Sequence, residues 1–241
     1  MILIILAAGK GSRLYPLTKK TPKCLVKYRG KPILDYQLEC CRKMKLKKIF
    51  LVSGFKSNKI KRRNIIKVEN KRYKSTNMLY SLFKLKRLFN GNNDLIISYG
   101  DIIYKNTLLK KIINSKEEIS TIIDKRWYSY WKSRMQNPLK DAESLRYNKN
   151  KYITDIGKKV KNLKKVQGQY IGLTKISKTI SKNILKVWMD INKKNKIKNA
   201  ENLYITDFLR LLIKKKFKLK AILVNRGWLE FDEPSDLNIK F

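Results

Sequence analysis

Short apolar runs alternate with longer amphipathic segments along the first half of the chain. Four short runs predict strands, at 2–6, 48–53, 64–69 and 94–99. Between them, apolar residues three and four positions apart predict helices over 32–44 and 76–89. Strands that alternate with helices are typical of a parallel sheet covered on both faces. We therefore expect a protein of the α/β class.

From Glu118 onward the pattern changes to separate strands and two amphipathic helices. The expected strands are 120–124, 152–156, 169–174 and 218–224, and the expected helices are 181–192 and 203–215. A turn is expected at 148–151. Because no internal repeat and no linker interrupts the chain, we expect one domain over 1–241, built from the halves 1–115 and 116–241.

The charge balance is extreme, with 58 Lys and Arg against 18 Asp and Glu and a net charge of +40. Such a charge can attract nucleic acid, anionic lipid or nucleotide phosphates, or it can reflect lysines spread over solvated faces by A/T-rich codons. The lysines are distributed along the whole chain. A basic nucleic-acid-binding protein would concentrate them on one face or beside a reading helix. We therefore expect no specific nucleic-acid partner.

The chain has no histidine, which excludes a Ser-His-Asp triad and leaves carboxylates, cations, a metal or positioning to support catalysis. Its cysteines, Cys24, Cys40 and Cys41, form no disulfide framework, as expected of a reducing compartment. The apolar run 1–9 is too short to span a bilayer, and no basic residue precedes it. We expect a cytoplasmic protein without a membrane partner.

The loop after the first strand has the small residues of a phosphate-binding loop. Its glycines let backbone amides approach an anion, although they could equally serve only to turn the chain. Leu14 stands where a dinucleotide-binding fingerprint needs a third glycine, and no Gly-Lys-Ser/Thr ending of a Walker loop follows. The candidate residues are Leu6, Ala7, Ala8, Gly9, Gly11, Ser12 and Arg13.

The whole segment 6–26, with Pro16, Thr18, Pro22 and Lys23, resembles the signature of the nucleotidyltransferases that make nucleotide-activated sugars and alcohols. The resemblance implies a Rossmann-like, glycosyltransferase-A-like fold whose first half binds a nucleoside triphosphate and whose second half binds the acceptor and completes a metal site. It also implies that Arg13 and Lys23 hold the phosphates as the catalytic cations. Positioned cations stabilise the charge that develops when the α-phosphorus is attacked.

Scarce carboxylates stand beside two apolar runs. Asp101 follows Gly100 at the end of a predicted strand, and Glu230 and Asp232 lie two residues apart, on one face of a segment that we expect to form a strand. The three could hold Mg²⁺ together with phosphate oxygens. Alternatively, Asp101 is a turn residue and Asp232 caps a helix. The resemblance favours metal binding, because the family has acidic metal ligands at both places.

Asn77 and Ser81 lie near the start of the predicted helix 76–89. This stretch resembles the helix of phosphocholine cytidylyltransferases in which an Asn and a Ser face the nucleotide. The other reading is a capped amphipathic helix, with Thr76 as the N-cap and leucines in the core. Both interpretations stay open.

Aromatic and polar residues of the second half resemble the acceptor site of cytidylyltransferases that act on phosphocholine or 2-aminoethylphosphonate. An aromatic face can hold an ammonium group, a carboxylate can pair with it, and an arginine can meet the phosphoryl end. Trp127 and Trp131 could instead be a helical packing pair. The candidates are Trp127, Trp131, Arg134, Asp141, Glu143, Gln169 and Tyr170.

These observations predict a Mg²⁺-dependent cytidylyltransferase that moves CMP from CTP to 2-aminoethylphosphonate or phosphocholine and releases pyrophosphate. A sugar 1-phosphate or a phosphorylated amino-acid-like compound is an alternative acceptor, since Asp141 and Glu143 can pair with any ammonium. A basic nucleic-acid-binding protein and an inactive nucleotide-binding protein are the alternatives of another class. The sequence leaves a homodimer open.

Overall fold

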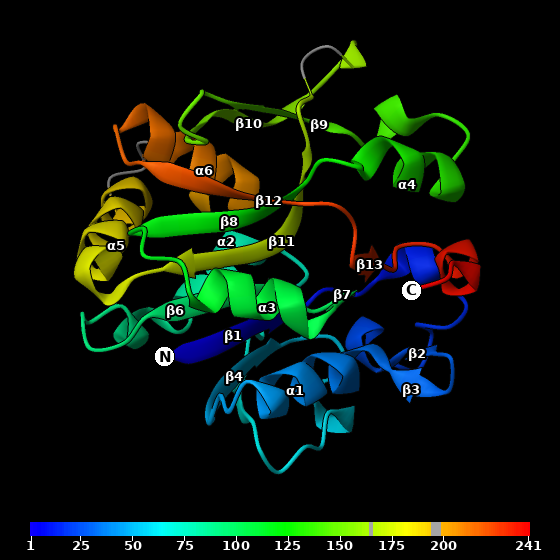
Figure 1. Ribbon diagram of the computed structural model, residues 1–241. Coiled ribbons are helices and arrows are strands. Elements are labelled where there is room, and N and C mark those ends of the chain that lie inside the picture. Colours follow the sequence, from blue (N-terminus) through cyan, green and yellow to red (C-terminus); the bar gives the residue numbers. More distant parts are fainter. Residues whose placement is uncertain (164–165, 194–198) are drawn as a thin grey trace.

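The computed structural model describes residues 1–163, 166–193 and 199–241. A seven-stranded sheet lies at its centre (Figure 1). Its strands, in spatial order, are β12 (Leu219–Val224), β8 (Ile119–Asp124), β11 (Gln169–Ile176), β6 (Leu95–Tyr99), β1 (Ile2–Ala7), β4 (Lys48–Ser53) and β5 (Ile66–Glu69). All neighbours run parallel except β11, which is antiparallel to both β6 and β8. The predicted single-domain, mostly parallel α/β fold is confirmed.

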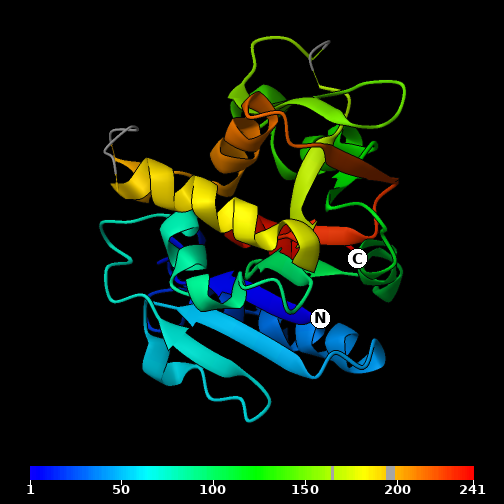
Figure 2. The same ribbon diagram turned by 90° about the vertical axis from the view of Figure 1, so that its left-hand side faces the viewer.

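Helices cover both faces of this sheet. On one face lie α1 (Ile33–Lys43) and α3 (Asn106–Ile113), and on the other lie α2 (Met78–Phe83), α5 (Lys178–Lys193) and α6 (Ile205–Lys214) (Figure 2). Alternate side chains of β1 explain how one strand serves two cores. Leu3 and Ile5 pack with α1 and α3, whereas Ile4 packs with the other three helices. The layered core therefore fixes β1 from both sides.

Shorter strands pair in separate two-stranded sheets outside the central sheet. The hairpin of β9 (Glu143–Tyr147) and β10 (Ile153–Lys159) closes through the turn predicted at 148–151, and α4 (Trp127–Arg134) follows β8. The short strands β2 (Lys27–Tyr28) and β3 (Lys31–Pro32) pair with each other. The strand β13 (Trp228–Glu230) pairs antiparallel with β7 (Ile102–Tyr104). This last pair brings the C-terminal carboxylates next to Asp101.

The sequence pattern placed most elements but missed some short ones. The expected helix 76–89 is a helix only over Met78–Phe83, followed by a 3₁₀ turn at Lys86–Leu88. The strands β7 and β9 were not predicted, since strands of three to five residues carry too few alternations to detect. The eight-residue helix α3 was not predicted either. Among the described residues, no helix is both long and apolar enough to cross a membrane.

Candidate nucleotide-binding site

A cleft of about 270 Å³ opens at the carboxyl end of β1, where ligands of open α/β sheets bind. The loop after β1, the start of α2 and the segment after β6 form its walls. All twelve residues that the sequence predicted for nucleotide binding line it: Leu6, Ala7, Ala8, Gly9, Gly11, Ser12, Arg13, Lys23, Asn77, Ser81, Gly100 and Asp101. The structure thus brings together residues from three segments that lie far apart in the sequence.

Two glycines of this wall are required by the geometry. Gly11 has a φ of +64°, and a Cβ there would lie 2.9 Å from the Cβ of Lys23. A Cβ at Gly100 would lie 2.7 Å from the Cβ of Ala7 and from the carbonyl oxygen of Leu6. Both positions therefore exclude larger residues. Their small size lets the loop pack against the stem of Lys23 and lets the end of β6 reach β1.

Asp101, Glu230 and Asp232 meet at one end of the cleft, with one carboxylate oxygen of each within 4.8 Å of the others. Lys23 Nζ lies between two of them, 2.7 Å from Asp101 Oδ2 and 2.6 Å from Asp232 Oδ1. Arg13 Nη2 is 3.0 Å from the same Asp232 oxygen. The predicted phosphate-binding cations and the predicted metal ligands therefore form a single charged cluster.

The charges of this cluster shift the ionisation of its members. Burial opposes the charge of Lys23, but Asp101 and Asp232 outweigh burial and raise its pKa. Burial alone would raise the pKa of Asp232, but the neighbouring cations Lys23, Arg13 and Arg134 outweigh burial and lower this pKa. Burial and then the Asp232 carboxylate raise the pKa of Glu230 to about 8. An added cation would relieve the repulsion between the closely spaced carboxylates of Glu230 and Asp232.

Arg134 is an internal partner of these carboxylates and is not free to bind the phosphoryl end of an acceptor. Its side chain is 2% exposed, and its guanidinium lies 2.8 Å from Glu230, 3.3 Å from Asp232 and 3.0 Å from Asp236. Its position over the rings of Tyr130 and Trp131 encloses it further. The predicted acceptor-binding role of Arg134 is therefore corrected. Its guanidinium instead holds the carboxylates of Glu230, Asp232 and Asp236 in place.

The carboxylate cluster fits a divalent cation. Asp101 Oδ1 is buried and has no hydrogen-bond partner among the described residues, so one oxygen of the cluster is unsatisfied. Oxygen ligands from a few carboxylates, completed by phosphate and water, are the set that Mg²⁺ prefers. Asp101, Glu230 and Asp232 are the residues that would hold such an ion.

Comparison with known proteins agrees with this geometry. Residues 2–129 match the nucleotidyl transferase family. A CTP:phosphoglutamine cytidylyltransferase of Campylobacter jejuni is 40% identical over an alignment covering 100% of this chain and 99% of that protein. The chain belongs to the nucleotidyl transferase family. A choline-phosphate cytidylyltransferase of Streptococcus pneumoniae is 31% identical over 48% of this nucleotidyltransferase and 51% of its own length.

Solved structures share the fold of this nucleotidyltransferase along nearly its whole length. A CTP:phosphocholine cytidylyltransferase from Streptococcus pneumoniae superimposes with a TM-score of 0.74 at 22% identity, covering 98% of this chain and 96% of its own. An inositol-1-phosphate CTP transferase from T. maritima gives a TM-score of 0.72 at 21% identity, covering 97% and 90%. At these identities the likeness concerns the fold alone.

The aromatic pair of this nucleotidyltransferase is part of the core. Trp127 and Trp131 are 4% and 3% exposed, and their rings pack edge to face with centroids 5.9 Å apart. Trp228 of β13 lies against Trp131 at 5.9 Å. The packing interpretation of these residues is therefore confirmed, and the aromatic face predicted for an acceptor ammonium is not exposed.

Of the remaining acceptor candidates, Gln169 and Tyr170 make contacts within the fold, and Asp141 lies beside the cleft. Gln169 is buried and exchanges hydrogen bonds with the backbone of Glu143, donating to its carbonyl at 2.7 Å. Tyr170 packs edge-on against Tyr99 and accepts a hydrogen bond from Thr174. Both residues therefore join strands. Asp141 lies 3.8 Å from Arg13, beside the cleft.

Glu143 is a half-buried carboxylate on β9. Burial and then the charge of Asp207 raise its pKa. No cation lies within ion-pair distance of it among residues 1–163, 166–193 and 199–241. An approaching ammonium group would therefore relieve its unfavourable charge. Asp141 and Glu143 remain the candidates for contact with a cationic acceptor group.

Sequence reasoning missed four residues that also line the cleft: Cys24, Tyr73, Thr76 and Met78. Three of them flank Asn77, in the segment that leads into α2. The Asn77 side chain accepts a hydrogen bond from the amide of Met78 at 2.8 Å and so caps this helix, rather than Thr76. The short apolar spacing of 78–83 gave no sign that the preceding turn would face the cleft.

Proposed function

We propose that this nucleotidyltransferase moves CMP from CTP to a phosphoryl oxygen of a small acceptor and releases pyrophosphate. The observation that carries the proposal is the convergence of Arg13, Lys23 and three carboxylates at one end of the cleft. Cytidylyltransfer in particular is supported by the activities named for two relatives that match this chain, one of them along its whole length.

Arg13 and Lys23 are placed to bind the triphosphate. Lys23 comes from a short 3₁₀ turn, and Arg13 from the loop after β1, so their charges meet from two directions. A bound triphosphate would compete with Asp101 and Asp232 for these cations. Negative charge grows on the α-phosphoryl oxygens and on the departing pyrophosphate, and both cations would stabilise it at close range.

Asp101, Glu230 and Asp232 would hold Mg²⁺, which supplies electrostatic stabilisation and orients phosphate oxygens when it is bound. Arg134 and Tyr130 fix two of these ligands, Glu230 and Asp232. The Tyr130 hydroxyl accepts a hydrogen bond from the Glu230 amide at 2.8 Å, while Arg134 binds the side chains of Glu230 and Asp232. Glu230 and Asp232 would therefore keep their positions when Lys23 and Arg13 turn to the phosphates.

The transfer itself requires no histidine. A phosphoryl or phosphonyl oxygen of the acceptor is already anionic near neutral pH, so no general base has to remove a proton from it. In-line attack forms a bond to the α-phosphorus and breaks the bond to the pyrophosphate oxygen. Orientation and charge neutralisation are then the main tasks of the protein.

We propose a phosphorylated amino-acid-like compound, with phosphoglutamine as the first candidate, as the acceptor. The 40% identical relative acts on phosphoglutamine by its name. Asp141 and Glu143 are anionic groups suited to an α-ammonium, and no tryptophan face for a quaternary ammonium is exposed at Trp127 or Trp131. The name of this relative favours the amino-acid-like class, and the burial of both tryptophans disfavours phosphocholine.

A substrate panel tests this function. CTP, UTP, dTTP and ATP would each be offered with phosphoglutamine, phosphocholine, 2-aminoethylphosphonate and glucose 1-phosphate, and pyrophosphate release would be followed with and without Mg²⁺. We expect turnover with CTP and phosphoglutamine that depends on Mg²⁺. Turnover confined to UTP or dTTP with the sugar phosphate would contradict the proposal, and preference for phosphocholine would contradict only the acceptor assignment.

A further inference from the structure

Asn70 is a buried polar residue that organises one wall of the nucleotide cleft without lining it. It is 1% exposed and directly follows β5. Its backbone amide donates to the carbonyl of Ser53 at 2.7 Å, which ties it to the end of β4. The side chain is therefore held in one place by two adjacent strands, and it points toward the turn that leads into α2.

Hydrogen bonds fix which end of the Asn70 amide faces which partner. The backbone N–H of Arg72 lies 3.0 Å from the side-chain oxygen, and because an N–H can only donate, that atom must be the oxygen. Both remaining N–H groups are then donors. They reach the hydroxyl oxygens of Thr76 and Ser81, each at 3.0 Å.

These bonds determine the directions of the two hydroxyl protons. Thr76 donates its proton to the carbonyl of Arg72 at 2.8 Å. Ser81 accepts from Asn70, and its own proton has no acceptor in the described part of the chain. Ser81 is 4% exposed and lines the cleft. Its hydroxyl is thus available to the cleft as a donor.

Asn77 offers a second donor on the same wall. Its side-chain oxygen accepts from the Met78 amide at 2.8 Å, which leaves its NH₂ group for other partners. Asn77 and Ser81 are four residues apart at the start of α2, so both lie on one side of that helix. Together they make a wall that presents hydrogen-bond donors to a nucleobase.

We propose that Asn70 is a positioning residue that makes Ser81 a hydrogen-bond donor and thereby selects cytosine over uracil. The inference rests on the proposed use of CTP. Cytosine presents two neighbouring acceptors, O2 and N3, whereas uracil presents O2 beside an N3–H donor. A wall with two donors can satisfy both cytosine atoms but leaves a donor facing a donor with uracil, a mismatch that lowers affinity.

The variant Asn70→Asp tests the proposal because it keeps the size of the side chain but reverses its hydrogen bonding. The carboxylate accepts the Ser81 proton, so the serine would present a lone pair to the cleft. Binding of CTP and of UTP would be measured by calorimetry with Mg²⁺ and without acceptor. We expect the ratio of the two affinities, CTP over UTP, to fall about tenfold or more.

Two serine variants complete the design. Ser81→Ala removes the donor and should also lower the CTP-to-UTP affinity ratio. Ser75→Ala makes the same change at an exposed position of the same turn, outside the lining of the cleft, and should leave the ratio unchanged. If Asn70→Asp fails to fold by circular dichroism, Ser81→Ala decides, and an unchanged ratio in that variant overturns the proposal.

The two proposals fail in different ways. If the wild-type protein binds UTP as tightly as CTP, the assignment of CTP is wrong. If the wild type prefers CTP and folded Asn70→Asp keeps the same ratio, the role of Asn70 is wrong while the cytidylyltransferase function stands. A loss of affinity for both nucleotides with an unchanged ratio would show a purely structural role for Asn70 and would also contradict the inference.

Discussion

Lys23 lies between two carboxylates of the cleft. Its side chain is 17% exposed, and its ammonium contacts Asp101 and Asp232, which lie 131 residues apart in the sequence. Desolvating such a cation is unfavourable unless it is paired on several sides. Because triphosphate oxygens offer the same pairing, Lys23 can pass from the carboxylates to a ligand with little change in its electrostatic environment.

Replacement of this lysine tests the catalytic assignment. Lys23→Ala should lower the turnover number by about a hundredfold or more, because one of the charges facing the leaving group is lost. Arg13 and Arg134 still pair with Asp232, so the fold should persist, as judged by circular dichroism. The matched control is Lys48→Ala, at an exposed position at the amino end of β4, away from the carboxyl end of the sheet where the cleft opens. Near-wild-type turnover of Lys23→Ala would contradict the assignment.

The three thiols predict a second result at the residue scale. Burial raises the pKa of Cys24 to about 12, of Cys40 to about 11 and of Cys41 to about 12. Since the thiolate is the reactive form, little of it is present at about pH 8 in the folded protein. Mass spectrometry should show slow alkylation by iodoacetamide, which becomes fast in concentrated urea. Equal rates in the two conditions would contradict the burial of these thiols.

Among the secondary-structure elements, α4 and β13 together determine where the carboxylates of Glu230 and Asp232 lie. Tyr130 of α4 bonds to the backbone of Glu230, and Arg134 bonds to Glu230 and to Asp232. Asp236 closes the network by accepting hydrogen bonds from the amides of Asp232 and Glu233. The C-terminal carboxylates are therefore held by a helix that lies about a hundred residues earlier in the sequence.

The loss of this helix contact should be visible in stability. Arg134→Met would leave buried carboxylates without their main cation, and we expect the free energy of unfolding to fall by about 3–5 kcal/mol. Urea denaturation gives this value. Lys132→Met, at an exposed position of the same helix, is the matched control and should change stability far less. Equal losses in the two variants would contradict the role of Arg134.

Some residues of the site could be predicted from the sequence, and others could not. The nucleotide wall was predictable because its residues belong to one continuous signature or to the ends of long apolar strands. The surroundings of Trp131 and Arg134 were not predictable, because their contacts come from a distant segment, β13. Asn70 contacts nearby residues, but nothing in the sequence indicated that this polar residue would be buried. An exposed cation and a buried one look alike in sequence when the partner carboxylates arrive from another part of the chain.

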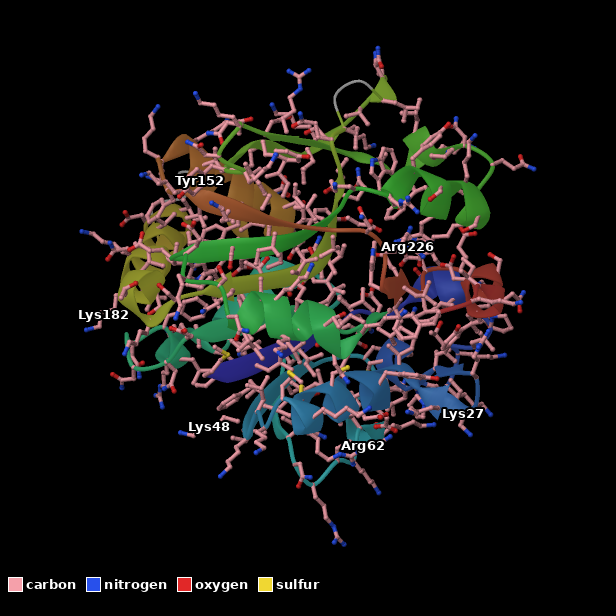
Figure 3. The ribbon with its side chains drawn as sticks, in the orientation of Figure 1. Lys27, Lys48, Arg62, Tyr152, Lys182 and Arg226 are labelled. Atoms are coloured by element: carbon pink, nitrogen blue, oxygen red, sulfur yellow. The ribbon has the colours of Figure 1, made fainter. Side chains whose placement is uncertain are left out.

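On the scale of the whole molecule, the excess positive charge surrounds the protein on all sides. Lys27, Lys48 and Lys182 extend outward from different elements (Figure 3). The cleft itself, in contrast, contains a near balance of cations and carboxylates. The net charge of +40 therefore acts as a general field and does not define the site.

Changing the ionic strength distinguishes the effect of this general field on nucleotide capture from the chemical step at the site. A highly anionic nucleotide should reach the protein faster at low salt, so kcat/KM for CTP should fall as sodium chloride rises from about 0.05 M to about 0.5 M, while kcat changes less. Steady-state kinetics at several salt concentrations give both values. A kcat/KM that does not respond to salt would contradict any contribution of the charge to nucleotide capture.

Attack of an acceptor phosphoryl oxygen on the α-phosphorus is the central claim about the whole molecule. Phosphoglutamine labelled with ¹⁸O on its phosphoryl group would be incubated with CTP and Mg²⁺, and the products would be analysed by ³¹P NMR and mass spectrometry. We predict a cytidine diphosphate product that carries ¹⁸O in its bridging position, together with unlabelled pyrophosphate. Formation of free CMP without a labelled diphosphate product would contradict the account.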